Sequence, residues 1–547
     1  MTDLAPTGHV DTFARDHLPP ADQWPVLEFT TPALRYPERL NAGHELLDAV
    51  IAEHGPDRPA LRTPDGTAWT YGELKERVDQ VAHVLVDDLG VVPGNRVLLR
   101  SPNNPWTVVA WLAVLKTGGV VVTTMAALRA TELTPIVEKT RPVVALVDHR
   151  FVDDVHAVRD SAAPDLVVVA YGGGAEDDLT RRVAGKPTHF DAVGTAADDV
   201  ALFGPTSGTT GVPKITTHFH RDVLAIDDTF GRDTLRLEKA DVVACTAPLA
   251  FTFGLGMLVV FPLRAGACAL LTEAATPVQL ADLVAEQGVT VLATAPTAYK
   301  QIVASGHVDR LAGLRVAVSA GEHMAQATWE GIRDAIGLKV IDGIGATEML
   351  HIFISAAGDD IRPGATGKPV AGYRAAILDA DGNEVGAGVE GRLGVIGPVG
   401  CRYLDDERQR GYVVNGWNVT GDTFLRDDDG YYWYRSRTDN MIVSSGYNIG
   451  GPEVEEALGT HPDVAEVGVV AAPDEQRGSI VCAFVVLREG VEGDAAKVTE
   501  LQDHVKGRLA PYKYPRAVRF VDALPRNTSG KLQHFKLRKI AEAEAGS

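Results

Sequence analysis

The segment Thr206-Ser-Gly-Thr-Thr-Gly-Val-Pro-Lys214 carries the residue types that bind a polyphosphate. Its glycines let backbone N–H groups point inward, its hydroxyls add uncharged donors, and Lys214 adds one mobile positive charge. A Ser/Thr/Gly-rich surface turn is the plain alternative. The segment is not a Walker loop, because Lys214 follows a proline and precedes Ile215. The chemistry predicts a phosphate loop whose contacts come from Thr206, Ser207, Gly208, Thr209, Thr210 and Lys214.

Two acidic side chains and two basic ones stand in patterns that suit a bound nucleotide. Glu348 follows the glycine-rich run that begins at Gly343, and a carboxylate there would be a natural Mg²⁺ ligand if it faced the phosphate loop. In general, a carboxylate can accept from both hydroxyls of a ribose, and a guanidinium can contact the same sugar; Asp422 and Arg437 are residues of these two types. Lys531 ends the run Pro525-Arg-Asn-Thr-Ser-Gly-Lys531, where an ammonium would stabilise charge that builds on two anionic groups. Taken singly, each of these residues is more often a solvated side chain.

The elements that must position these residues alternate between short β-branched runs and helical spacing from about Glu45 to Ile341. Strands are expected at 96–99, 143–147, 166–169, 200–203, 289–292, 315–318 and 339–341, and helices at 106–116 and 277–287. This alternation implies parallel sheets with helices on both faces. The loops that follow 200–203, 315–318 and 339–341, the last being Asp342-Gly-Ile-Gly345, should share one crevice at the carboxyl ends of their strands.

The pattern changes near Arg437. A helix is expected at 452–458, strands at 464–471 and 479–487, and a longer helix at 495–509. This is the pattern of a small α+β domain of about a hundred residues. Since 547 residues are too many for one ordinary core, we expect two domains, 1–438 and 439–547.

Composition narrows the class of protein. A hydrophobic content of 45% is ordinary for a globular enzyme, and a net charge of −21 argues against nucleic acid as the main partner. The basic stretch 504–547 could close over an anionic nucleotide. Pro262 and Arg264 interrupt the apolar run 251–271, which we expect to be buried in protein and not in a membrane. We expect a cytoplasmic protein, because no signal peptide is visible and no zinc-site spacing joins Cys245, Cys268, Cys401 and Cys482.

In this order, these segments resemble the acyl- and aryl-adenylate-forming superfamily, which includes acyl-CoA ligases, peptide-synthetase adenylation domains and luciferases. The resemblance covers nearly the whole chain. It implies an α/β fold, with a large N-terminal domain of parallel and mixed sheets flanked by helices, and a small mobile α+β C-terminal domain. It also implies three catalytic residues: Glu348 as the Mg²⁺ ligand, Thr347 beside the nucleotide phosphate, and Lys531 between the carboxylate and the α-phosphate.

The resemblance extends to the nucleotide, the hinge and coenzyme A. Asp422 and Arg437 are expected at the ribose, Asp439 at the interdomain hinge, and Gly446 where the pantetheine arm passes close to the backbone. This chain has Ile344 where the family often has an aromatic residue near adenine. Further contacts to ATP or AMP are expected from Ser319, Gly321, Glu322, Asp342 and Gly343.

Within the superfamily, the segment 342–353 is similar to benzoate-CoA ligases and their 2-aminobenzoate relatives, and the segment 9–24 is similar to the 2-aminobenzoate branch. Benzoate enzymes tend to have Ala-Tyr where this chain has Thr252-Phe253, which moves a hydroxyl from one wall position to its neighbour. Small residues facing aromatic ones suit a flat acid, although ordinary core packing is the alternative for the two phenylalanines. The expected ring pocket consists of Phe251, Thr252, Phe253, Ala320, Gly345, His351 and Ile352.

The resulting hypothesis is an aryl-CoA ligase that uses ATP, Mg²⁺ and coenzyme A on a small carboxylic acid, with 2-aminobenzoate or a related benzoate as the expected substrate. A homodimer is left open. The alternatives are transfer of the acyl group to a carrier-protein thiol, a ligase for a different bulky acid, and luciferase-like oxidation of the adenylate. A nucleotide-sensing or scaffold protein on the same fold is disfavoured because both Glu348 and Lys531 are present.

Overall fold

The computed structural model describes residues 4–206, 212–321, 324, 326–437, 441–525, 532 and 534–545. The chain divides into two compact units, the first made of residues 1–126, 137–205 and 215–436, and the second of residues 127–136, 206–214 and 437–547. The predicted domain boundary between residues 438 and 439 stays a prediction, because 438–440 lie outside the described residues.

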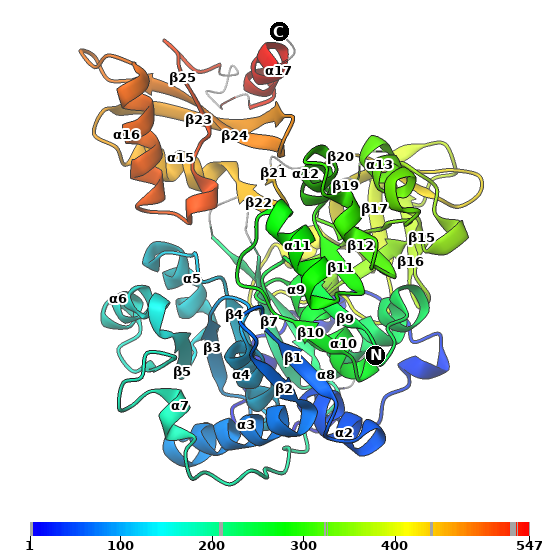
Figure 1. Cartoon of the computed structure of the whole chain (residues 1–547). Coiled ribbons are helices and arrows are strands. Elements are labelled where there is room, and N and C mark those ends of the chain that lie inside the picture. Colours follow the sequence, from blue (N-terminus) through cyan, green and yellow to red (C-terminus); the bar gives the residue numbers. More distant parts are fainter. Residues whose placement is uncertain are drawn as a thin grey trace. The chain divides into compact units, whose positions relative to one another are not determined.

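One sheet of the first unit has six strands, counted over the described residues, in the order β6-β5-β3-β4-β7-β8. Strand β3 pairs with β4 and β5, β5 pairs with β6, and β4 pairs with β7; all four pairings are parallel, as the strand–helix alternation predicted. Helix α4 (Pro105–Lys116) packs against β3 and β4 (Figure 1) and begins where it does because the Asn104 side chain accepts from the Thr107 N–H. The strands are β3 (Arg96–Arg100), β4 (Val120–Thr124), β5 (Val144–Asp148), β6 (Val167–Tyr171), β7 (Val200–Thr206) and β8 (Lys214–Phe219).

A second sheet of the same unit orders its nine described strands as β15-β14-β13-β12-β11-β9-β10-β1-β2. Helix α11 (Pro277–Gln287) starts at a Thr276 cap and ends at Gly288 in the left-handed conformation, close to the predicted helix. The strands are β1 (Pro59–Arg62), β2 (Ala68–Thr70), β9 (Val242–Cys245), β10 (Cys268–Leu270), β11 (Val291–Thr294), β12 (Val316–Ala320), β13 (Ile341–Gly345), β14 (Ile352–Ser355) and β15 (Lys368–Pro369).

The run Asp342-Gly-Ile-Gly345, predicted to be a loop, is instead part of β13. Its residues pair in the antiparallel direction with β14, with Gly343 opposite Ser355 and a register shift between Ile344 and Gly345. The two glycines are needed for close packing, since a Cβ on Gly343 would lie 2.8 Å from an Ile352 side-chain carbon. The turn that carries Glu348 therefore begins only after Gly345.

A third sheet of the first unit joins β16-β17-β19-β18, with β20 paired to β19, again counted over the described part of the chain. It carries Asp422 on β19, and its strand β20 ends at Arg437, the residue at which the last segment of the second unit begins. The strands are β16 (Arg374–Leu378), β17 (Glu390–Ile396), β18 (Val413–Val414), β19 (Trp417–Arg426) and β20 (Tyr432–Arg437).

In the second unit, β23 is covered on both faces (Figure 1). Val469 belongs to the apolar cluster that contains residues of α15 (Gly451–Gly459) and α16 (Ala495–Lys506), whereas the next residue, Val470, packs with residues of α17 (His534–Ala545). Successive side chains of a strand point to opposite faces, so this alternation fits a sheet between helices. The strands are β21 (Met441–Ser444), β22 (Tyr447–Gly450), β23 (Val464–Asp474), β24 (Gly478–Leu487) and β25 (Ala517–Phe520).

The apolar run 251–271 forms α9 (Thr252–Leu255), a π-helical segment, α10 (Phe261–Ala265) and β10, and most of its residues are buried, as predicted. Over the described residues, we find no helix with both the length and the apolar character needed to cross a membrane. The fold class expected from the sequence is confirmed. The remaining helices are α1 (Phe13–Asp16), α2 (Ala49–His54), α3 (Tyr71–His83), α5 (Ala130–Thr140), α6 (Val152–Ala162), α7 (Leu179–Arg182), α8 (His220–Ile226), α12 (Pro296–Ala304), α13 (Gln326–Ile336) and α14 (Gln409–Tyr412).

Candidate active site

The predicted phosphate loop connects two neighbouring strands. Thr206 is the last residue of β7 and Lys214 is the first of β8. Four of the predicted contacts lie outside the described residues, namely Ser207, Gly208, Thr209 and Thr210.

Gly204 brings the strand before this loop close to the turn that carries Glu348. A Cβ on Gly204 would lie 2.6 Å from the Thr216 Oγ1 atom and 3.0 Å from the Thr347 Cγ2 atom. The Thr216 hydroxyl donates to the Gly204 carbonyl oxygen at 3.1 Å. Any larger residue at 204 would separate these elements, so the spacing between β7 and the Thr347 turn depends on this glycine.

His218, on β8, fixes the backbone of that turn. Its Nε2 atom lies 2.8 Å from the carbonyl oxygen of Thr347, which can only accept, so this nitrogen carries the proton. Burial lowers the pKa of His218 to about 4, so the imidazole is neutral near pH 7. The contact is therefore a neutral hydrogen bond that survives over the physiological pH range.

The Glu348 carboxylate lies in the short helical turn Thr347–Met349 and is 6% exposed. The Tyr403 hydroxyl donates to its Oε1 atom at 2.5 Å. A carboxylate is a hard oxygen ligand of the kind that Mg²⁺ takes, and a hydroxyl partner such as Tyr403 does not cancel its charge. The residues present thus fit a divalent cation at Glu348.

The strand ends predicted to contact ATP or AMP contain a buried carboxyl group. Ser319 and Asp342 are register partners on β12 and β13, and Gly321 follows with a φ of 89°. Burial raises the pKa of Asp342 to about 8, although the backbone N–H of Gly343 and the hydroxyl of Ser319 act in the opposite direction. The carboxyl group of Asp342 is therefore largely protonated at pH 7. Glu322 lies outside the described residues.

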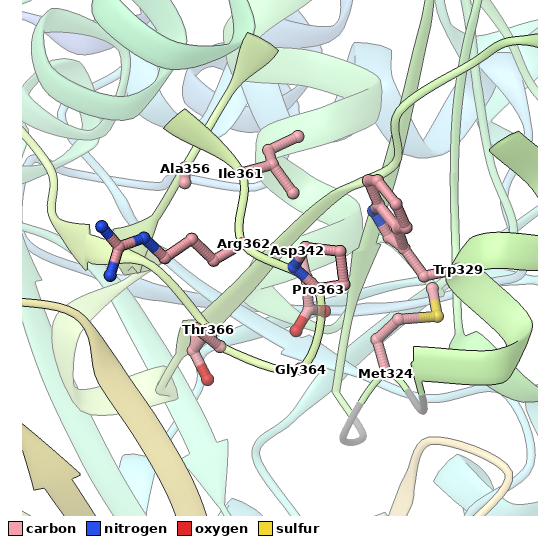
Figure 2. A pocket seen from close by; sticks show the side chains of 10 residues that line it. Met324, Trp329, Asp342, Ala356, Ile361, Arg362, Pro363, Gly364 and Thr366 are labelled. Carbon is pink, nitrogen blue, oxygen red and sulfur yellow. The ribbon is translucent and has the colours of Figure 1, made fainter. Parts of the chain in front are cut away.

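Asp342 lines a small pocket beside these strands. Figure 2 shows its carboxyl group near Pro363, with Trp329 and Met324 on one side of the pocket, while the Arg362 side chain extends away in the opposite direction. A mostly apolar wall with a few polar groups suits a flat heteroaromatic ring. The complete lining is Met324, Trp329, Asp342, Ala356, Ile361, Arg362, Pro363, Gly364, Ala365 and Thr366.

The ribose contacts are placed only in part. Asp422 is 8% exposed, and its backbone N–H lies 3.4 Å from the Thr420 hydroxyl. Arg437 ends β20, but its side chain is outside the described part of the chain. The predicted pairing of these two residues around a sugar stays a prediction.

His351 lies at the centre of an aromatic cluster. Its ring centroid is 5.6 Å from that of Phe253, 5.3 Å from that of Phe230 and 4.6 Å from that of Phe261, which meets it edge to face. Phe253 was predicted from the sequence as a pocket residue, whereas Phe230 and Phe261 were not. Gly256 makes room for the imidazole, since a Cβ there would lie 2.6 Å from the His351 Nε2 atom.

Burial lowers the pKa of His351 to about 3, against a smaller opposite effect of the Phe253 backbone. By distance and angle, neither ring nitrogen makes a well-formed hydrogen bond with a residue that the structure describes, although the Phe253 backbone is close enough to affect the pKa of the ring. Gly345 touches this residue directly, because a Cβ at 345 would lie 2.7 Å from the His351 carbonyl oxygen. The structure thus brings together His351, Phe253, Gly345 and the adjoining Ile352.

The other predicted pocket residues lie on neighbouring elements. Thr252 is the first residue of α9 and Phe251 precedes it, both half-buried, and Ala320 ends β12 with 7% exposure. Two further predicted residues, Lys531 and Asp439, lie outside the described residues.

Gly446 occupies the turn between β21 and β22. Its φ is 79°, and that of the preceding Ser445 is 48°, so two consecutive left-handed residues make the turn, and glycine accommodates this without strain. Arg477 donates to the Ser445 hydroxyl at 3.2 Å. In the same unit, cationic groups flank the Tyr514 ring, with Lys506 Nζ at 4.6 Å and Arg516 Cζ at 4.7 Å from its centroid.

Comparison with known proteins identifies the family. Residues 48–402 match the family described as AMP-binding enzyme, and residues 453–531 match its C-terminal domain. The chain is 35% identical to a benzoate–CoA ligase of Thauera aromatica over 516 residues, which cover 93% of this chain and 98% of that protein.

Two solved structures are similar over almost the whole chain. The anthranilate CoA ligase AuaEII, solved with anthranoyl-AMP, has a TM-score of 0.72 at 32% identity and covers 94% of this chain and 100% of its own. A benzoate CoA ligase from Burkholderia xenovorans LB400 has a TM-score of 0.69 at 30% identity, with coverages of 91% and 100%. The chain therefore belongs to the AMP-binding enzyme family and, within the adenylate-forming superfamily, to the AMP-forming acyl/aryl-CoA ligases.

Proposed function

We propose that this enzyme activates 2-aminobenzoate, or a closely related benzoate, as an aryl adenylate and then transfers the aryl group to coenzyme A. In the first step, the carboxylate oxygen attacks the α-phosphorus of ATP and pyrophosphate leaves. In the second, the thiol of coenzyme A attacks the acyl carbon and AMP leaves. Anthranilate is 2-aminobenzoate, and the solved relative bound to anthranoyl-AMP supports this choice of acid.

The main support for this choice of acid is the environment of His351. Its imidazole is neutral, and its ring nitrogens make no well-formed hydrogen bond with the described residues. A buried acceptor without a partner costs free energy, and an ortho-amino group of a bound ring would supply a donor. Phe253 would provide an aromatic surface, and Thr252 a hydroxyl at the pocket wall. Benzoate, which lacks the ortho group, would leave these polar atoms unpaired.

For ATP, we infer that the Glu348 carboxylate holds Mg²⁺ and that Thr347 lies beside a phosphate. When bound, the cation would neutralise charge on the phosphate oxygens as pyrophosphate leaves. His218 and Gly204 support this inference, because they fix the Thr347 turn against the strands that flank the predicted phosphate loop. Asp422 and Arg437 would bind the ribose, and Lys531 would stabilise charge on the reacting carboxylate and α-phosphate.

We assign the pocket beside Asp342 to one edge of the adenine ring. A protonated carboxyl group offers one acceptor and one donor, which match the amino group and the N1 atom of adenine. Trp329 and Met324 would provide the apolar surroundings.

The second unit is the proposed site of coenzyme A. Gly446 would let the pantetheine arm pass, and the guanidinium of Arg477 beside Ser445 would attract the phosphates. We propose a cytoplasmic location, which is supported by the four buried cysteines, since they form no disulfide in the described part of the chain.

The test is acid-dependent exchange of pyrophosphate into ATP, measured with 2-aminobenzoate, 2-hydroxybenzoate, benzoate and octanoate. We expect the ortho-substituted acids to exceed benzoate in kcat/KM and octanoate to fail. Thr252→Ala should narrow the gap between the ortho-substituted acids and benzoate. A preference for octanoate would contradict the assigned pocket and leave the ligase chemistry standing.

A further inference from the structure

We propose that Tyr403 is a positioning residue for the metal-binding carboxylate, an inference that rests on the proposed role of Glu348 as a Mg²⁺ ligand. The Tyr403 hydroxyl donates to the Glu348 Oε1 atom at 2.5 Å. Because an ionised carboxylate only accepts hydrogen bonds, this contact fixes the direction of the Glu348 side chain and does not neutralise the carboxylate.

Tyr403 is itself held rigidly. Its side chain is fully buried, and its backbone N–H donates to the Gln409 Oε1 atom at 2.9 Å. It forms an isolated antiparallel bridge with Thr216, and the next residue, Leu404, donates its N–H to the Ile215 carbonyl oxygen at 2.8 Å. Tyr403 is therefore attached to β8, the strand that begins where the predicted phosphate loop ends.

The turn that carries Glu348 is also attached to β8, through a backbone group of the turn. His218, two residues beyond Thr216 on β8, is bonded to the Thr347 carbonyl oxygen at 2.8 Å. Residues two apart on a strand face the same side, so Thr216 and His218 present one surface to Tyr403 and to the turn. The backbone at Thr347 and the carboxylate of Glu348 are thus both held by contacts to β8, the first through His218 and the second through Tyr403.

This arrangement matters because a glutamate side chain has three rotatable bonds, and fixing them costs conformational entropy on each binding event unless the protein has already fixed them. Mg²⁺ demands near-ideal octahedral geometry, so a misdirected ligand weakens its binding. Residues that orient a metal ligand typically change metal affinity or activity by about 10–100-fold when they are removed. Tyr403 is in the place to do this for Glu348.

The experiment measures metal binding directly, independently of turnover. Mn²⁺ is titrated into the full-length protein with the non-reactive analogue α,β-methylene-ATP, and free Mn²⁺ is followed by electron paramagnetic resonance. We expect Tyr403→Phe to weaken Mn²⁺ binding by about tenfold or more, and to raise the Mg²⁺ concentration at half-maximal pyrophosphate release in parallel. The KM for the aryl acid should change little.

Tyr412→Phe is the matched control. Its ring packs edge to face on Tyr403, with centroids 5.7 Å apart, and the change leaves the hydrogen bond from Tyr403 to Glu348 in place. The Mn²⁺ affinity of the Tyr412→Phe protein should stay within about twofold of that of the unmodified protein, whereas Tyr403→Phe is expected to weaken it by about tenfold. Equal Mn²⁺ affinities for Tyr403→Phe and the unmodified protein would overturn the proposal.

Glu348→Gln separates the two levels of the argument. If it weakens Mn²⁺ binding while Tyr403→Phe does not, the positioning role fails and the metal role stands; if neither variant does, the metal role of Glu348 fails as well. Should Tyr403→Phe not fold, 4-aminophenylalanine and 4-methylphenylalanine at position 403 provide a size-matched pair with and without a donor. Weaker Mn²⁺ binding by the methyl variant would support the proposal, and equal binding by the pair would overturn it.

Discussion

Replacing Asp342 with asparagine should stabilise the protein, and more strongly at pH 7 than at pH 5. Burial raises the pKa of this carboxyl group from 3.8 to about 8. The stability linked to the protonated carboxyl group is fully present below pH 3.8 and is lost as the pH rises through 8. Over this range the unfolded chain ionises freely, whereas the native state must either keep the proton or hold a charge in a buried position. The dependence amounts to about 1.4 kcal/mol per pH unit, or about 3 kcal/mol between pH 5 and pH 7. Asparagine carries no charge and should show none of this dependence.

The assay is thermal or urea unfolding of both proteins without nucleotide from pH 5 to pH 8. Asp359→Asn is the control. Asp359 is exposed and paired with Lys339 at 2.7 Å, which lowers the pKa of the Asp359 carboxyl group. The substitution should therefore change the free energy of unfolding by about the same amount at both pH values. The Asp342→Asn protein should gain on the unmodified protein steadily over this range. An equal stability difference at pH 5 and pH 7 would refute a buried carboxyl group of raised pKa at this position.

Three further predictions concern the two half-reactions. Lys531→Ala should slow adenylate formation by roughly 10²–10³-fold, as for a lost transition-state donor, while thioester formation from pre-made aryl adenylate is largely kept; equal loss of both steps in a folded protein would argue for a structural role. Asp439→Pro fixes one backbone angle at the proposed hinge and should retain pyrophosphate release but strongly reduce thioester output, so full coenzyme A turnover would exclude the hinge assignment. Asp422→Ala should weaken ATP binding by about 1–3 kcal/mol, the range for a buried charged hydrogen bond, with less effect on the acid; equal handling of ATP and 2′-deoxy-ATP by the unmodified enzyme would show that the ribose contact is not made.

Much of the fold could be predicted because local signals agree with the tertiary structure. The β-branched run at Arg96 became β3, and the Asn104 and Thr276 caps start helices close to where the hydrophobic spacing placed them. Asp342-Gly-Ile-Gly345 was predicted wrongly because two glycines favour a turn locally, whereas their backbone groups find partners in β14, a strand that only the fold brings alongside.

Short segments of the sequence were enough to propose candidate site residues. Glu348, Phe253 and His351 were predicted in this way, and the structure buries Glu348 and His351; their roles stay predictions. Tyr403 was missed because its partner Glu348 lies 55 residues away along the chain, and no local pattern marks that contact. His218 on β8 could have been noticed, since Thr216 and His218 are two residues apart on the strand that directly follows the phosphate loop and so face the same side.

The central claim is that one protein forms an aryl adenylate and then consumes it with coenzyme A. Its most direct test is a single-turnover reaction with excess enzyme, Mg²⁺-ATP and labelled 2-aminobenzoate, quenched before and after addition of coenzyme A. We expect one equivalent of aryl-AMP and pyrophosphate to accumulate first, and the aryl-AMP then to convert into 2-aminobenzoyl-CoA with release of AMP. Failure to form aryl-AMP from any aromatic acid, or an adenylate that coenzyme A leaves untouched, would contradict the account.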